Sequence, residues 1–220
     1  VEIKKSNFIG SEVKFRDDHM PRVHVALAVE GAKWTDTRLI PLLISTVLIG
    51  SHEKGAAIGA GANLASHFAR NCVEENLCDS FQAFNSQYKD TGLWGIYFIT
   101  ERLKVEKMVQ HVAREWSRLS SSISENELKR GKALLKTQYM MGLSTTQSLF
   151  DESSRQILYH GRRIYFQEFA AKIDKLTMNE FKAAMVDFID EKDIALAAIG
   201  PTEGIPEYIR ICNMMRSYLS

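Results

Sequence analysis

Two stretches near the start of the chain alternate between polar and apolar residues. In Ser11–Arg16 the apolar residues are Val13 and Phe15, and in Arg22–Gly31 apolar residues take every second position. A period of two is typical of a half-buried β-strand. We predict that both stretches are strands and that they form an antiparallel pair across the intervening turn.

A third stretch has the pattern of a hairpin whose two arms differ. Ser80–Tyr88 is largely polar, Gly92–Thr100 is almost wholly apolar, and Lys89–Gly92 carries turn residues. The apolar arm is expected to be a central strand covered by helices. The polar arm is expected to keep one face available, where a partner or a peptide could lie.

The region between these strands predicts a core helix and a flexible loop. The apolar run Leu39–Gly50 is about a dozen residues long, whereas a membrane span needs about 20, so it indicates a core helix over Thr35–Ile49. Asp36 lies near the expected start of this helix, where the helix dipole favours a carboxylate. Gly50–Ala62 predicts a loop without the features of a phosphate-binding motif. It leads into a short helix, Asn63–Cys72, for which Asn63 is the expected cap.

Beyond the hairpin the pattern becomes helical. Val105–Leu119 places five apolar residues on one stripe: Val105, Met108, Val109, Val112 and Trp116. Capping boxes are expected at Ser124 with Glu127 and at Thr177 with Glu180. The remaining predicted elements are helices at Ser124–Leu143, Gln147–Tyr159, Tyr165–Ile173 and Asn179–Phe188, a strand at Asp193–Gly200 and a last helix at Ile205–Tyr218.

This order of elements predicts the fold class. Paired strands with the helices grouped after them favour an α+β fold, with a mostly antiparallel sheet packed against a layer of helices. We expect residues 1–220 to form a single domain. Because Val1 is not an initiator methionine, we also expect the chain to be part of something longer.

Charge and cysteine content narrow the class of protein. The formal net charge is +1, which gives no electrostatic argument for a nucleic-acid partner. Cys72, Cys78 and Cys212 are odd in number and lack a metal or redox spacing, so we expect buried or half-buried free thiols in a reducing compartment.

Candidate catalytic and metal-ligating residues are sparse. The sequence contains neither a zinc-peptidase histidine motif nor a serine-nucleophile elbow, so we assign no catalytic residue and no metal ligand. His111 and Glu115 are one helical turn apart and could hold a metal, but a solvated helix pair is the favoured interpretation. His24 alternates with apolar neighbours and is expected to be structural. The six histidines are scattered: His19, His24, His52, His67, His111 and His160.

An acidic cluster precedes the hairpin arm with the available face. Glu74, Glu75 and Asp79 could bind a basic peptide, and the alternative is a solvated acidic loop. Arg162 and Arg163, which follow Gly161, are expected in a surface loop.

Several segments resemble a known family along nearly the whole chain. They are similar to the C-terminal half of the β subunits of mitochondrial processing peptidases, within the pitrilysin-type zinc metallopeptidases. The most specific run is Tyr88–Tyr97. The segments are TVLIG, NLCDSFQAFNSQYKDTGLWGIYFI, REWSRL, LKRGKALLKT, SRQILYHGRRI, KIDKLT and AIGP.

The resemblance implies a function that this chain would share with other parts. It implies an N-terminal half that holds the zinc, an α subunit as partner, presequence peptides as substrates and a location in the mitochondrial matrix. This half would close the substrate chamber without a zinc site, with Glu74, Glu75 and Asp79 as candidate substrate-facing residues. The close relative, a core subunit of the respiratory cytochrome bc complex, implies a structural alternative with little or no peptidase activity.

One family feature is not carried over. Many single-chain relatives have an arginine and, seven residues later, a tyrosine that help to hold the substrate. The matching positions here are Cys72 and Asp79, so the resemblance does not imply that role for them.

Overall fold

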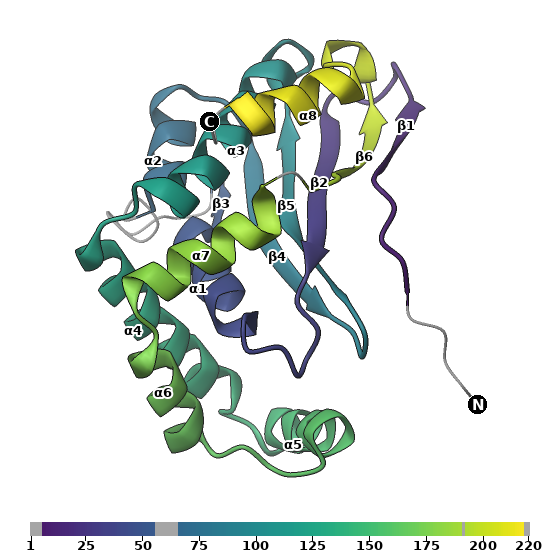
Figure 1. The fold of residues 1–220 in the computed structure, drawn as a ribbon. Coiled ribbons are helices and arrows are strands. Elements are labelled where there is room, and N and C mark those ends of the chain that lie inside the picture. Colours follow the sequence, from purple (N-terminus) through teal and green to yellow (C-terminus); the bar gives the residue numbers. More distant parts are fainter. Residues whose placement is uncertain (1–5, 56–65, 191, 218–220) are drawn as a thin grey trace.

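A computed structural model describes residues 6–55, 66–190 and 192–217. It consists of one six-stranded sheet with the helices gathered on one side (Figure 1). The strands are β1 (Ser11–Arg16), β2 (Val23–Gly31), β3 (Ser51–Glu53), β4 (Ser80–Gln87), β5 (Gly92–Thr100) and β6 (Ala195–Gly200). The helices are α1 (Leu39–Ile49), α2 (His67–Glu74), α3 (Val105–Ser121), α4 (Glu125–Gly142), α5 (Thr146–His160), α6 (Phe166–Lys175), α7 (Met178–Ile189) and α8 (Tyr208–Ser217).

The sheet order is β1-β6-β2-β5-β4-β3, and every neighbouring pair is antiparallel except β1 with β6. The predicted antiparallel pairing of β1 with β2 is therefore wrong. The last strand, β6, lies between them, and Asp17 closes the end of β1 by donating its backbone N–H to the Gly200 carbonyl at 2.9 Å. The expected half-burial of β1 is also wrong, because this edge strand is exposed at every residue.

The predicted hairpin is confirmed as β4 and β5. Its turn closes with the Tyr88 N–H donating to the Thr91 carbonyl at 2.9 Å. Strand β5 is central, between β2 and β4. A β-carbon at Gly95 would collide with the Leu27 carbonyl oxygen, so only glycine lets β2 and β5 approach this closely.

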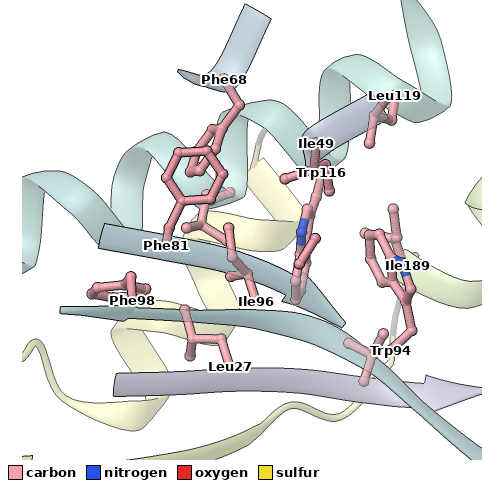
Figure 2. Close-up of a cluster of buried hydrophobic side chains, with 14 of the residues drawn as sticks. Leu27, Ile49, Phe68, Phe81, Trp94, Ile96, Phe98, Trp116, Leu119 and Ile189 are labelled. Atoms are coloured by element: carbon pink, nitrogen blue, oxygen red, sulfur yellow. The ribbon is translucent and has the colours of Figure 1, made fainter. Parts of the chain in front are cut away.

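The core lies between the sheet and the helices (Figure 2). Trp94 of β5 packs on Trp116 of α3 with ring centroids 4.9 Å apart, and its indole N–H donates to the Thr46 hydroxyl of α1 at 3.1 Å. Phe68 of α2 meets Phe81 of β4 edge-on at 4.7 Å. All five residues of the predicted α3 stripe are fully buried, which confirms the face assigned from the sequence.

Capping explains where several helices begin. Thr177 and Glu180 form the predicted capping box of α7. The box expected at α4 is only half formed: Ser124 accepts the Glu127 N–H, while the Glu127 carboxylate binds Arg118 instead of the Ser124 backbone.

Three predicted helix starts differ from the structure by three or four residues. The last helix, α8, begins at Tyr208 rather than at Ile205. Helix α1 begins at Leu39 rather than at Thr35, because Asp36 accepts hydrogen bonds from the Arg38 backbone and guanidinium and holds residues 34–38 in turns. Helix α2 begins at His67 with Ser66 as its cap. The predicted cap Asn63 and most of the glycine-rich loop lie outside the described residues, and Ser51–Glu53 forms β3 where a loop was expected.

Helices α4, α5 and α6 extend beyond the end of the sheet (Figure 1). Helix α5 contacts the rest of the molecule through Tyr159, which stacks on Trp34 with ring centroids 5.2 Å apart, and through the amide of Gln156. In the described part of the chain, no helix combines the length and apolarity that a membrane span requires.

Candidate functional site

One face of the sheet is left open by the described helices, and we call it the open sheet face. The strand register places His24, Tyr97 and Gln82 on this face, from three neighbouring strands. His24 Nδ1 lies 2.6 Å from the Tyr97 hydroxyl oxygen, so the imidazole has the hydrogen-bond partner that a structural role requires. Gln82 is exposed, which confirms that the β4 arm keeps an available face.

The open sheet face is more apolar toward the β1 edge. Val13 and Phe15 are 67% and 63% exposed, and their register partners in β6 are Ala197 and Ile199. Farther from this edge, polar residues such as Ser80 and Ser86 occupy β4. The face therefore changes from apolar to polar across the sheet, which suits contact with a chain of mixed character.

The acidic residues Glu74, Glu75 and Asp79 lie at and just after the C-terminal end of α2. Asn76 has a positive φ of 47° and ends α2, while the Leu77 N–H donates to the Cys72 carbonyl and the Asn76 N–H to the Val73 carbonyl. This pair of hydrogen bonds is a Schellman motif, with the left-handed residue that such motifs require. It reverses the chain within a few residues and leads directly into β4.

The three acidic side chains have different surroundings. The Glu75 carboxylate lies 2.6 Å from Lys107 Nζ and 3.3 Å from His111 Nε2. Its hydrogen bond with Lys107 and the nearby His111 lower its pKa below the ordinary value. Asp79 is half-buried, pairs with the Arg22 guanidinium, and lies 3.8 Å from Lys54 Nζ.

Glu74 is exposed and has no ion pair within the described ranges, so it is the least compensated charge of the cluster. Glu74, the last residue of α2, and Glu75, its C-cap, are both exposed, so a solvated position fits these two and not the half-buried Asp79. Glu75 and Asp79 nevertheless pair with cations from distant parts of the chain. Sequence reasoning missed these partners: Arg22 precedes β2 and Lys107 lies on α3, and neither position carries a local signal that points to residues 74–79.

The predicted solvated pair of His111 and Glu115 is wrong, because both side chains are buried at 7% and 3% exposure. Glu115 accepts two hydrogen bonds from Arg118, which also binds Glu127 of α4, and one contact from His67 of α2 at 3.0 Å. Burial alone would raise the Glu115 pKa, but the hydrogen bonds from Arg118 and His67 outweigh it and lower the pKa below 4.5. The four residues tie α2, α3 and α4 together.

The cysteines are free thiols, with Cys72 and Cys78 buried and Cys212 half-buried, as expected. Hydrogen bonding with Cys78, reinforced by burial, raises the pKa of the Cys72 thiol and keeps it protonated. Arg162 and Arg163 are exposed, and Arg162 pairs with Glu168 at 2.6 Å.

The scattered histidines do not converge on a metal site. Among residues 6–55, 66–190 and 192–217, no group of three or more His, Cys, Asp or Glu side chains is placed to hold a metal ion. The described residues therefore do not fit a zinc ion. What they offer is the open sheet face and, separately, an acidic cluster at the end of α2, where Glu75 pairs with Lys107 of α3 on the helical side of the sheet.

Residues 2–135 match the family model described as the peptidase M16 inactive domain. The chain belongs to the peptidase M16 family. It is 40% identical over 209 residues to the β subunit of the mitochondrial-processing peptidase of Rattus norvegicus, and this match covers 95% of the chain but 42% of that relative. The corresponding subunit of Blastocladiella emersonii is 39% identical, with 94% of this chain and 44% of the relative covered.

The fold comparison agrees with this family. A chain of complex III2 from Candida albicans superposes with a TM-score of 0.91 at 28% identity, covering 97% of this chain and 51% of that one. The predicted resemblance and the α+β fold of the M16 type are thereby confirmed. The chain spans less than half the length of the curated relatives it matches.

Proposed function

We propose that this chain is the zinc-free half of a β-type subunit of the mitochondrial processing peptidase, located in the matrix. The whole enzyme, with an N-terminal half that carries zinc and with an α subunit, would remove presequences from imported proteins. One observation carries the proposal: 40% identity along 95% of the chain to a subunit of that name. The presequence substrate, the α subunit and the zinc-bearing half are parts of the proposal.

In this function the chain contributes a wall of the substrate chamber. The open sheet face belongs to a six-stranded sheet and changes from apolar to polar across it. Presequences are rich in arginine and poor in acidic residues, and many are amphipathic. The apolar end of this face is chemically suited to the apolar side of such a peptide, and the acidic residues that precede β4 are suited to its arginines.

The proposal is tested by reconstitution. The full-length subunit combined with an α subunit should cleave an arginine-rich presequence peptide, and a chelator should abolish the cleavage. The 220-residue chain alone should leave the peptide intact. Cleavage by the chain alone, sensitive to a chelator, would overturn the assignment of catalysis to another half.

We further propose that Glu74, Glu75 and Asp79 face the substrate and attract its positive charge. Exposed charges act mainly on association and are screened over about 8–10 Å at physiological salt. Replacing all three by their amides in the assembled enzyme should raise KM at low ionic strength and leave kcat nearly unchanged. Glu74→Gln alone should account for much of the increase, because Glu75 and Asp79 are already paired with cations.

A control variant matches the change in net charge. Glu125, Asp190 and Glu207 are exposed acidic residues distant from α2 in the sequence, and replacing them by amides should leave KM unaltered. Equal effects of the two triple variants on KM would show that the total charge of the chain determines KM and that the positions of Glu74, Glu75 and Asp79 do not.

The second candidate function is a structural subunit of the respiratory cytochrome bc complex. The TM-score of 0.91 to a chain of complex III2 favours it specifically. Affinity purification of the full-length subunit from mitochondrial membranes distinguishes the two. Stoichiometric recovery with cytochrome b, without presequence cleavage, would favour the structural role.

A further inference from the structure

Helix α5 presents an apolar stripe to solvent. Phe150, Ile157 and Leu158 are 66%, 57% and 74% exposed, and with Ser154 they recur at spacings of three and four residues, which places them on one side of the helix. We call these four residues the α5 apolar face. Met141, at the end of α4, adds a further exposed apolar side chain at 69%.

We propose that the α5 apolar face is the docking surface for the other half of the same subunit. This inference rests on the proposed function, because that function implies a second half. It goes further by assigning the residues that join the two halves.

The interior side of α5 does not explain the stability of the helix. Its only buried residue is the polar Gln156, whose amide donates to the Tyr139 hydroxyl at 2.9 Å and accepts the Ile164 N–H at 2.8 Å. Most helical stability in proteins comes from packing an apolar face, and an isolated helix of about 15 residues is marginal in water. Here the larger apolar face points outward, and within the chain α5 packs mainly through the Tyr159–Trp34 stack and its polar contacts with Tyr139, so a contact with another body would add the apolar packing that the helix lacks.

The composition of this face favours a permanent contact. Three of its four residues are large and apolar and none is charged, while Asp151 and Arg155 lie on the adjoining stripe of the helix. Permanent interfaces are more apolar than transient ones and exclude charge from their centre. A soluble substrate or a briefly bound partner would not require such a centre.

The length of the relatives indicates the occupant. The chain covers 42% of the rat relative and 51% of the complex III2 chain, so about half of each of those chains lies outside the match. A second half tethered to this one is present at high effective concentration and covers the face permanently. The α subunit and a second copy of this chain are the alternatives that the experiment separates.

Hydrogen exchange of the backbone amides of α5 tests the proposal without mutation. Three samples are compared: the 220-residue chain, the full-length subunit, and the full-length subunit with the α subunit. The amides of residues 146–160 should exchange roughly tenfold or more slowly in the full-length subunit than in the chain alone, because docking suppresses local opening. The α subunit should add little.

The other results would overturn the inference. Slowing that requires the α subunit would assign the face to that partner, and equal exchange in all three samples would leave the face without an occupant. Concentration-dependent slowing in the chain alone would identify a second copy. Presequence cleavage is measured on the same full-length sample, so active enzyme with unprotected α5 refutes this inference and leaves the proposed function standing.

A pair of variants supplies a second readout. Leu158→Asp in the full-length subunit should speed the exchange of α5 toward the rate in the chain alone. Leu103→Asp is the matched control, since Leu103 is 93% exposed and lies just before α3. It should leave the exchange of α5 unaltered, and equal effects of the two variants would contradict the proposal.

Discussion

Helices α3 and α5 have similar lengths, 17 and 15 residues, but opposite relations to the fold. Helix α3 buries eleven residues, including Trp116 against Trp94 and the ion-paired Glu115. Helix α5 buries Gln156 and exposes its largest apolar side chains. The difference shows that α3 is stabilised by packing within the chain, whereas α5 buries little there and exposes the apolar face for which we propose a partner.

The largest effect should come from removing the centre of the α3 packing. Trp116→Ala should lower the free energy of unfolding by about 3–5 kcal/mol, because it leaves a cavity against Trp94. Leu158→Ala on α5 should change it by less than about 0.5 kcal/mol in the same chain. Urea unfolding followed by circular dichroism measures both, and similar losses would contradict the contrast between the helices.

The next effect should come from the buried ion pair of α3. Glu115→Gln should cost about 3 kcal/mol, the lower end for breaking a buried pair, since Arg118 retains Glu127. Because the folded-state pKa of Glu115 is lowered, its contribution is complete above pH 4.5 and is lost as the pH falls through the folded value. The gap between wild type and variant should therefore narrow in acid.

An ion pair on α6, the helix that follows α5 in the chain, provides the matched control for Glu115→Gln. Glu168 is held by Arg162 and Lys172, which lower its pKa to about 2, but its side chain is 34% exposed and therefore reached by water. Glu168→Gln should shift the urea midpoint only slightly, since water screens exposed pairs. A larger shift for Glu168→Gln than for Glu115→Gln would reverse the comparison.

The smallest global effect should come from the tether of α5. Tyr159→Leu removes the stacking on Trp34, which contributes about 0.5–1.5 kcal/mol beyond the buried area. The loss should appear as faster hydrogen exchange confined to α5, with little change in the midpoint of the whole chain. A uniform rise in exchange across α3 and α5 would show that the two helices unfold as one unit.

Much of the fold was predictable because its signals are local. The alternation in β2, the hairpin turn at residues 89–92 and the apolar stripe of α3 each depend on neighbours within a few positions. The neighbour of β1 in the sheet could not be predicted from such local signals. Its alternation of Val13 and Phe15 indicates a strand, but whether the neighbour is β2 or β6 depends on a segment nearly 180 residues away.

In the candidate site, too, the residues with a local sequence signal could be predicted and their distant partners could not. Glu74, Glu75 and Asp79 could be singled out by sequence, while Arg22 and Lys107, which set their electrostatic environment, could not. The burial of His111 and Glu115 was also missed, since a polar pair one turn apart resembles a solvated face. The spacing of Glu115 and Arg118 by three residues was the one local signal of the ion pair.

The parallel pairing of β1 with β6 has a consequence during protein synthesis. Strands β2 to β5 can assemble once residue 100 has left the ribosome, but β1 finds its partner only after residue 200 has emerged. At a translation rate of about 5–20 residues per second, β6 emerges roughly 10–40 s after β1. During that time Val13 and Phe15 lie on an unpaired strand, where they offer a chaperone that recognises short apolar segments a binding site.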